Sequence, residues 1–255
     1  IDLVFDQLYA RFKIQAAKHV YNYPFLMGQG IWMDSDKLGP DDKVGEVLKH
    51  GTLTVGFIGL AECLKALMGV HHGESEQAQR MGLTIVSRMR KRMDEESRKT
   101  GLNFSVIATP AEGLSGRFVR LDKKRYGVIP GVTDRDYYTN SFHVPVYYPI
   151  SAFKKIRLEA PYHELTNGGH ISYVELDGDP SKNLAVFEKL IRAYEKAEQS
   201  GYYNVAGAEP CSVIILKRPF GDIPAGKKLL WVCGDRGFHC AAGIFGGELK
   251  CSGRL

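Results

Sequence analysis

A strand and a helix follow directly on one another in residues 52–69, TLTVGFIGLAECLKALMG. Residues 52–58 are rich in β-branched and apolar side chains, which is typical of a strand that ends at Gly59. Residues 60–69 then predict a helix that is closed by its C-terminal glycine. Because a buried strand leading at once into a helix is the repeating unit of α/β proteins, the sequence predicts that fold class.

Predicted helices and strands alternate on both sides of this unit. Helical periodicity and capping residues predict helices at 2–20, 40–50, 75–99 and 181–200, and β-rich runs predict strands at 103–108 and 170–176. This alternation favours right-handed crossovers. Residues 21–40 and the stretch 113–149, which is rich in glycine and proline, are predicted to be loops. Two short apolar runs, 213–216 and 229–232, predict a strand hairpin.

The composition is that of a globular protein. Hydrophobic residues make up 44% and charged residues 25% of the 255 positions, which excludes a disordered, collagen-like or coiled-coil chain. No apolar run has the length of a membrane span. The net charge of +5 is too small to indicate nucleic-acid binding. Five cysteines without a signal peptide favour a reducing, cytoplasmic location.

Glu62 is the first candidate for a catalytic residue. Its neighbours along the chain are apolar, so its carboxylate is expected to be desolvated, with a raised pKa that suits an acid or base near neutral pH. The alternative, which composition alone favours, is a glutamate that only stabilises the positive end of a helix. The adjacent Cys63 is predicted to be buried and unreactive rather than activated by the helix dipole.

Two polar loops are candidates for ligand binding. Residues 137–143 (YYTNSFH) place hydroxyl, amide and imidazole groups between aromatic rings, and they can either bind an anion such as phosphate or form a turn that satisfies itself. Residues 109–118 (TPAEGLSGRF) directly follow a predicted strand, where α/β folds place ligand sites. Within them Arg117 can pair with Glu112 or with an oxyanion of a ligand, and we favour the ion pair.

Metal binding has little support in the sequence. The neighbours His71 and His72 are predicted to lie in a solvated turn, because adjacent loop residues rarely bind one ion. Four of the five cysteines fall in the last 45 residues, but without a C-x2-C spacing, so a zinc ribbon is not predicted. We therefore assign no metal ligand.

Several stretches together resemble the catalytic domain of the anaerobic (class III) ribonucleoside-triphosphate reductases, which are glycyl radical enzymes. They span residues 21–203 and are, in chain order, 22–30 (NYPFLMGQG), 50–53 (HGTL), 56–62 (GFIGLAE), 104–105 (FS), 109–112 (TPAE), 127–134 (GVIPGVTD), 137–143 (YYTNSFH), 159–162 (EAPY) and 167–169 (NGG). Their combination is specific to this family, although no single stretch would suffice.

The resemblance implies a fold and a reaction. The fold is a ten-stranded α/β barrel, of which residues 1–203 are the later portion. The reaction replaces the 2′-hydroxyl of a ribonucleoside triphosphate by hydrogen, in deoxyribonucleotide biosynthesis for DNA replication. A stored glycyl radical generates a cysteine thiyl radical that abstracts the 3′-hydrogen, and formate supplies reducing equivalents in many members. The family also implies ATP binding, a radical-SAM activating enzyme as partner, and a homodimer in the full-length protein.

The resemblance also implies roles for individual residues. Glu62 matches the position that we associate with the active-site glutamate, a proton acceptor near the 3′-hydroxyl, so we predict it to be catalytic. The predicted substrate-binding residues are Thr139, Asn140, Ser141, His143 and Glu112. Cys63 gains no role, because the thiyl cysteine of the family precedes the first matching stretch.

Residues 204–255 depart from the family. The family has a zinc site with two cysteine knuckles and then a glycyl radical loop, whereas this chain has only 231–235 (WVCGD), a faint counterpart without knuckles. We therefore predict a divergent tail, arising from a frame error or from true divergence, and assign no radical to Gly234. The chain begins at Ile1, without the regulatory and first-half-barrel parts of the family.

From these departures we expect an incomplete piece of the enzyme that is inactive on its own. Two alternatives remain open at the level of sequence. One is another glycyl radical enzyme of the acyl lyase type, and the other is a non-catalytic nucleotide-binding remnant. Neither a membrane nor a nucleic acid is expected as a partner.

Overall fold

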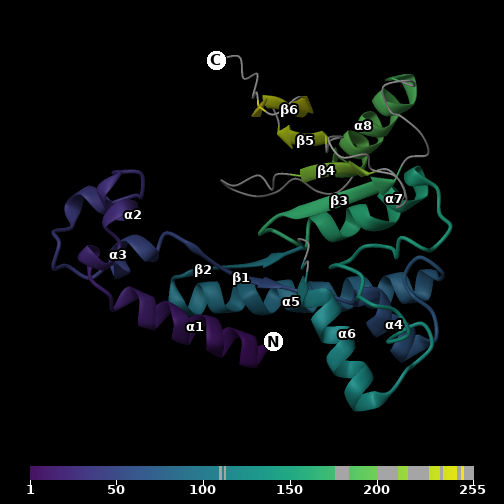
Figure 1. Ribbon diagram of the computed structural model, residues 1–255, viewed down its shortest axis with the longest axis horizontal. Helices are drawn as coiled ribbons and strands as arrows, with labels where there is room; N and C mark the ends of the chain where they lie inside the picture. The colour runs from purple at the N-terminus through teal and green to yellow at the C-terminus, as the bar shows by residue number, and fades with distance from the viewer. Residues whose placement is uncertain are drawn as a thin grey trace. The chain divides into compact units, whose positions relative to one another are not determined.

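The computed structural model describes residues 1–108, 111, 113–175, 184–199, 212–217, 230–235, 238–245 and 248–249 (Figure 1). By its internal contacts the chain divides into two compact units, which we describe separately. Unit 1 comprises Ile1–Val55 and Ser87–Val106, and unit 2 comprises Gly56–Val86 and Ile107–Leu255.

Unit 1 begins with helix α1 (Asp2–Ala16), which ends four residues before the predicted boundary. Although its sequence is amphipathic, α1 has no fully buried residue. Residues 21–40, predicted to be a loop, instead form the short helices η1 (Val20–Asn22), α2 (Pro24–Gly28) and η2 (Ser35–Lys37). The proline at the first position of α2 is suited to a helix start, because the missing N–H has no partner there.

Helix α3 (Gly45–Leu48) is shorter than predicted and completes the small core of this part of unit 1. Its Val47 is buried with Met27 and Val44, and Trp32 packs against them. These side chains hold the short helices together, although the glycines and prolines of residues 21–40 predict a loop.

Strands β1 (Thr52–Gly56) and β2 (Asn103–Ile107) pair with each other, at the positions the sequence predicts. Asn103 donates to the Thr52 hydroxyl over 2.7 Å, and the hydroxyls of Thr54 and Ser105 lie 3.0 Å apart. Because both contacts advance in the same direction along the two strands, the pairing is parallel. Helix α5 (Glu76–Thr100), also predicted, lies between them in the chain.

Unit 2 begins at Gly56, within the strand–helix junction of residues 52–69. Helix α4 (Leu60–Met68) is flanked by two glycines in the left-handed region, Gly59 at φ 78° and Gly69 at φ 77°. Its residues Leu60 and Leu64 are buried in the main apolar core of the unit, with Val86, Ala108, Phe142 and Tyr162. The core therefore holds α4 against α5 and against the loop that contains Phe142.

Two helices of unit 2 were not predicted: the first contradicts the loop expected over 113–149, and the second follows that stretch, where we predicted no element. Helix α6 (Gly113–Tyr126) starts at a glycine, and helix α7 (Ala152–His163) contains Pro161 near its C-terminal end. The hydroxyl of Ser151 caps α7 by accepting from the Lys154 N–H over 3.4 Å. Tertiary packing thus overrides the local preference of glycine and proline for loops.

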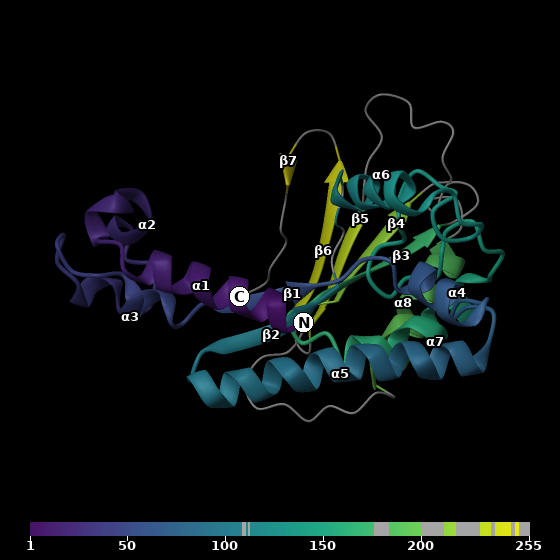
Figure 2. The ribbon, with the colours of Figure 1, turned by 90° about the horizontal axis from the view of Figure 1, so that it is seen from below.

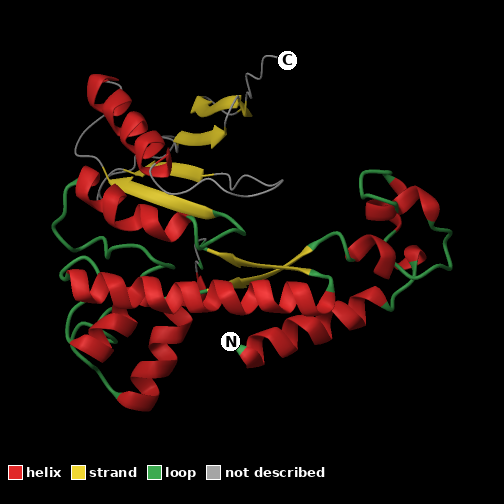
Figure 3. Ribbon diagram, turned by 180° about the vertical axis from the view of Figure 1, so that it is seen from behind, coloured by secondary structure: helices red, strands yellow, loops and turns green. Residues whose placement is uncertain are grey.

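The remaining strands form a five-stranded sheet in the order β3-β4-β5-β6-β7 (Figures 2 and 3). These are β3 (His170–Glu175), β4 (Ser212–Lys217), β5 (Leu230–Asp235), β6 (Phe238–Phe245) and β7 (Glu248–Leu249). β3 and β4 are parallel, and helix α8 (Leu184–Gln199) lies between them in the chain. β4 and β5 are antiparallel, which confirms the predicted hairpin strands.

Parallel strand pairs joined through helices confirm the α/β class. Helix α7 contacts both β3 and α8, so it is the element that connects this sheet to the loops before it. Within the described part of the chain, no helix combines the length and apolar character that crossing a membrane requires.

Candidate functional site

Glu62 lies in the first turn of α4, directly after the left-handed turn at Gly59. The side chain is 5% exposed, so the carboxylate is almost completely removed from solvent. The turn exists because only glycine adopts its positive φ without strain, and it aims the start of α4 at the loop 139–144. Glu62, which we predicted to be catalytic, is therefore a buried carboxylate at a strand–helix junction.

Thr139 holds this carboxylate in place. Its backbone N–H and its hydroxyl both donate to Glu62 Oε1, over 2.9 and 2.6 Å. The carbonyl of Thr139 in turn accepts from the Gly59 N–H over 2.7 Å. Three hydrogen bonds thus fix the loop and the N-terminus of α4 to one another.

Burial raises the pKa of Glu62, because the ionised form loses its hydration. The two hydrogen bonds from Thr139 and the positive charge of Arg135 oppose this effect without cancelling it. The raised pKa is the direction that the apolar sequence around Glu62 predicts, and it prevails over the lowering expected at a helix N-terminus.

The second carboxylate oxygen, Glu62 Oε2, is buried and has no hydrogen-bond partner among the described residues. A buried acceptor without a donor is costly and therefore uncommon in folded proteins. The ring of Tyr138 and the Cα of Gly59 lie beside it, since a Cβ built on Gly59 would be 3.7 Å from Oε2 and 3.5 Å from the Tyr138 ring. Among the described residues, Glu62 Oε2 is thus an acceptor available to an incoming hydroxyl.

An exposed cation lies near this carboxylate. The guanidinium of Arg135 stacks 3.4 Å over the ring of Tyr147, and its charge lowers the pKa of Glu62. Neighbouring Tyr138 donates its hydroxyl to Asp122 over 2.8 Å. The negative charge of Glu62 raises the pKa of the Tyr138 and Tyr147 phenols, in addition to the larger effect of burial.

The four predicted substrate-binding residues of the loop take different positions. Thr139 contacts Glu62, as described, and Asn140 uses its side-chain oxygen to accept from the Ala111 N–H over 3.0 Å. Ser141 is fully buried with a positive φ of 46°, and His143 is 5% exposed beside Glu159. The structure thus brings Thr139 to Glu62 and turns His143 toward a different carboxylate. Direct substrate contact by any of the four stays a prediction.

The remaining candidate residues are Glu112, Arg117 and Cys63. Glu112 lies outside the described residues, and Arg117 is exposed on α6. Cys63 is exposed rather than buried, so that prediction is wrong, because its side chain leaves α4 on the face away from the core. Partial desolvation nevertheless raises the pKa of the Cys63 thiol, which disfavours the reactive thiolate.

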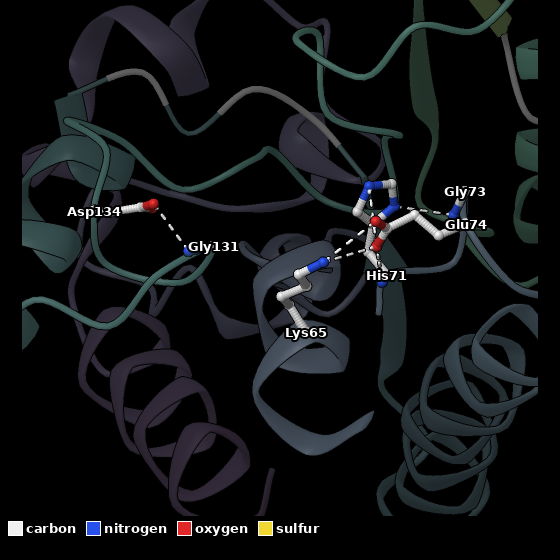
Figure 4. Close-up of polar contacts among 6 residues, drawn as sticks. All are labelled: Lys65, His71, Gly73, Glu74, Gly131 and Asp134. Carbon is white, nitrogen blue, oxygen red and sulfur yellow. Dashed lines mark hydrogen bonds and ion pairs between the residues drawn. The ribbon is translucent and has the colours of Figure 1, made fainter. Parts of the chain in front are cut away.

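A second polar cluster fixes the other end of α4 (Figure 4). Lys65, one turn after Glu62, points toward Glu74 and lies 3.2 Å from both carboxylate oxygens. Glu74 Oε2 also accepts from the His71 N–H over 2.7 Å. In the neighbouring turn, Asp134 accepts from the Gly131 N–H over 2.9 Å, directly before Arg135.

His71 and His72 are 3% and 1% exposed, so the predicted solvated turn is wrong. His72 Nε2 donates to the carbonyl of Phe142 over 2.8 Å, and its ring meets Tyr162 edge-on. His71 meets the ring of Tyr148. Burial lowers the pKa of both histidines, to about 4 for His72, so both are neutral near pH 7. Long-range packing, which local sequence does not reveal, determines their burial.

Glu159 on α7 is a functional candidate that the sequence analysis missed. Its side chain is 1% exposed, and its Oε1 accepts from the Val144 N–H over 2.9 Å and from Lys155 over 2.7 Å. Its Oε2 lies 3.4 Å from His143 Nδ1. Although burial opposes it, the pKa of Glu159 is lowered to about 2 because Lys155 and His143 stabilise the anion. The spacing of Lys155 and Glu159, four residues apart in a helix, was the available signal.

Two further buried histidines were also missed. The rings of His163 and His170 stack with centroids 3.8 Å apart, against Phe142. Burial lowers their pKa values, to about 4 and about 2, so they are neutral near pH 7. Among the residues that the structure describes, no group of three or more His, Cys, Asp or Glu side chains is arranged to hold a metal ion.

A buried carboxylate with a raised pKa, an acceptor oxygen without a donor among the described residues, and a nearby cation define an enzyme-like site. This site is located where a strand meets a helix in an α/β fold. Comparison with known proteins identifies the family to which the chain belongs. The family model described as anaerobic ribonucleoside-triphosphate reductase matches residues 1–208. The chain belongs to this family, which confirms the resemblance found in the sequence.

Individual relatives carry the same description. The anaerobic ribonucleoside-triphosphate reductase of Escherichia coli K12 is 45% identical over 142 residues, which are 54% of this chain and 20% of that protein. The enzyme of the same name from Enterobacteria phage T4 is 38% identical over 192 residues, 74% of this chain and 30% of that protein. The chain thus spans about a fifth of the bacterial relative and less than a third of the phage relative.

Solved structures give a weaker similarity. An anaerobic ribonucleotide reductase overlaps 76% of this chain and 31% of its own with a TM-score of 0.48 and 14% identity. The Thermotoga maritima anaerobic ribonucleotide reductase with dATP bound in the specificity site overlaps 58% and 25%, with a TM-score of 0.47 and 16% identity. At this level the overlap carries no argument about individual residues.

Proposed function

We propose that this chain is part of an anaerobic reductase that converts ribonucleoside triphosphates to 2′-deoxyribonucleoside triphosphates, and that Glu62 is its active-site carboxylate. The observation that supports the proposal is the buried Glu62 Oε2, an acceptor without a donor among the described residues. A ribose hydroxyl would supply the missing donor. Family membership favours this reaction over the acyl lyase and non-catalytic alternatives.

Glu62 would accept a hydrogen bond, and then a proton, from the 3′-hydroxyl of the substrate. Its raised pKa makes the carboxylate a stronger base than an exposed glutamate. Thr139 would keep Oε1 occupied, so that Oε2 alone faces the substrate. The exposed Arg135 would attract the anionic triphosphate toward the site.

The family supplies the radical chemistry, in which a glycyl radical acts through a cysteine thiyl to abstract the 3′-hydrogen. In this chain Gly234 does not fit the radical position, because it lies inside β5, paired with Ser212 of β4 and His239 of β6 rather than in a loop. The described residues show no zinc site either. We therefore assign no step to a radical or a metal held by this chain.

Several wider properties belong to the same proposal. The whole enzyme would contain the ten-stranded α/β barrel of the family, form a homodimer, and require formate as reductant and a radical-SAM activating enzyme as partner. We expect the whole enzyme to act in the cytoplasm. Membership in the family supports these properties.

The experiment that tests the proposal is replacement of Glu62 by glutamine in the full-length polypeptide that contains this sequence. With its activating enzyme, formate and ribonucleoside triphosphate, Glu62→Gln is expected to lower kcat by about 10²- to 10⁴-fold, the usual contribution of a general base. Glu188→Gln is the matched control, because Glu188 is exposed and, within the described part of the chain, pairs with Arg192 on the surface of α8. Turnover of Glu62→Gln equal to that of the control would remove the role assigned to Glu62.

A further inference from the structure

The loop 139–144 is held between two buried carboxylates whose pKa values are shifted in opposite directions. At one end Thr139 donates twice to Glu62, which has no cation in direct contact among the residues that the structure describes and whose pKa is raised. At the other end Val144 donates to Glu159, which pairs with Lys155 and whose pKa is lowered. Glu159 is therefore a permanently ionised group near neutral pH, whereas Glu62 is the carboxylate that can exchange a proton.

The residues between these two ends leave the loop little freedom. Ser141, Phe142 and Val144 are completely buried, and the Phe142 carbonyl accepts from His72 over 2.8 Å. The His143 N–H bonds back to the Asn140 carbonyl over 3.1 Å. Movement of Val144 would consequently be transmitted through a packed segment to Thr139, rather than absorbed by a flexible one.

We infer that Glu159 is a positioning residue, which accepts the Val144 N–H and thereby keeps the Thr139 donors on Glu62 Oε1. Lys155 is the counter-ion that lets Glu159 remain ionised in a buried place. Other groups that face Glu159 are His143, His72, His163 and Tyr162, and the first three are neutral near pH 7. The inference depends on the proposed function only in naming Glu62 as the reacting group.

Two variants separate the hydrogen bond of Glu159 from its charge. Glu159→Asp keeps the anion beside Lys155, but it withdraws the acceptor from Val144 by one C–C bond, about 1.5 Å. The double variant Lys155→Met/Glu159→Gln removes both charges and keeps an acceptor oxygen of the original length. Glu188→Asp makes the same shortening in an exposed glutamate–arginine pair with the same four-residue spacing.

The measurement is amide hydrogen exchange in the 255-residue chain, read at Thr139 and Val144 and compared with Val86 in the core of α5. In Glu159→Asp we expect exchange at Thr139 and Val144 to accelerate about tenfold, equivalent to one hydrogen bond, with Val86 changed by less than about threefold. In the double variant and in Glu188→Asp, exchange at Thr139 is expected to remain within about threefold of the parent chain.

Two results would overturn the inference. One is a Thr139 rate in Glu159→Asp that rises no more than the Val86 rate. The other, which remains readable if Glu159→Asp does not fold, is loss of Thr139 protection in the double variant, since charge rather than the acceptor would then hold the loop. Because exchange requires no turnover, failure of the proposed reductase activity would be recognised separately.

Discussion

Thr139 donates two hydrogen bonds to Glu62, and they act against the desolvation of the carboxylate. The neutral, protonated form of Glu62 needs these donors less than the ionised form does. Each bond therefore lowers the pKa of Glu62 and adjusts how strongly it holds a proton. Proton affinity at the site therefore depends mainly on burial, and the Thr139 hydrogen bonds oppose it in part.

Replacement of Thr139 by valine should raise the pKa of Glu62 further. Valine has nearly the shape of threonine but lacks the 2.6 Å hydroxyl bond, so the ionised carboxylate loses one of the two donors that Thr139 provides. We expect this rise to be measurable by ¹³C NMR titration of the labelled Glu62 carboxyl, because the lost donor stabilises only the ionised form. Thr139→Ser keeps the donor and should leave the value unchanged. A pKa that stays the same or falls in Thr139→Val would contradict this account.

At the level of the elements, helix α5 contains a glycine, Gly82, that allows neighbouring helices to pack closely. A Cβ at Gly82 would collide with the Tyr162 hydroxyl and approach Leu64 Cδ1 to 3.2 Å. The absence of a side chain lets α5, α4 and α7 approach one another in the main core. In an open helix, the same glycine would simply reduce stability relative to alanine.

Gly82→Ala should therefore destabilise the chain, contrary to the usual effect of alanine in a helix. We expect a loss of about 1–3 kcal/mol in the free energy of unfolding, the range for overpacked cores, measured by urea denaturation. Gly113→Ala is the control, because a Cβ on the first residue of α6 has open space around it. If the Gly82→Ala variant proves as stable as the parent chain, the close approach of α5 to Tyr162 is not tight.

The elements that the sequence predicted correctly are those whose local pattern and packing agree. The β-branched run of β1, the periodic apolar face of α5 and the closing glycine of α4 each specify their structure within a few residues. α6 and α7 were missed because a glycine start and Pro161 suggest a loop, whereas burial of Val119 and Ile156 favours a helix. Glu62 was predictable from apolar neighbours, but Glu159 was not, because its partners His143 and Val144 are distant along the chain.

At the scale of the whole molecule, each unit has an apolar core of its own, and that of unit 2 is lined by imidazoles. Phe142 and Tyr162 stack in its centre, and His72, His163 and His170 surround them. Neutral histidine packs there as an aromatic side chain, but a protonated one would place an uncompensated charge in the core. Acid should therefore weaken unit 2 at a higher pH than that at which Glu159 is protonated.

The sign of this pH dependence follows from the pKa values. His72 and His163 have folded-state pKa values of about 4, against an ordinary value of 6.5. Between these values the unfolded chain binds more protons than the folded chain. Stability is therefore complete above 6.5 and lost as the pH falls toward 4, by about 3 kcal/mol for each histidine. Glu159 contributes at lower pH, because its stabilisation is lost only as the pH falls from 4.5 toward 2.

Urea unfolding at about pH 7 and about pH 5 should show this loss, and His163→Phe should reduce it. Phenylalanine keeps an aromatic ring on His170 and binds no proton, so the variant loses less stability on acidification even if it is less stable at neutral pH. His50→Gln, which removes an exposed histidine from unit 1, should follow the parent chain. An equal loss of stability in His163→Phe and in the parent chain would show that the buried imidazoles do not govern the acid sensitivity of the core.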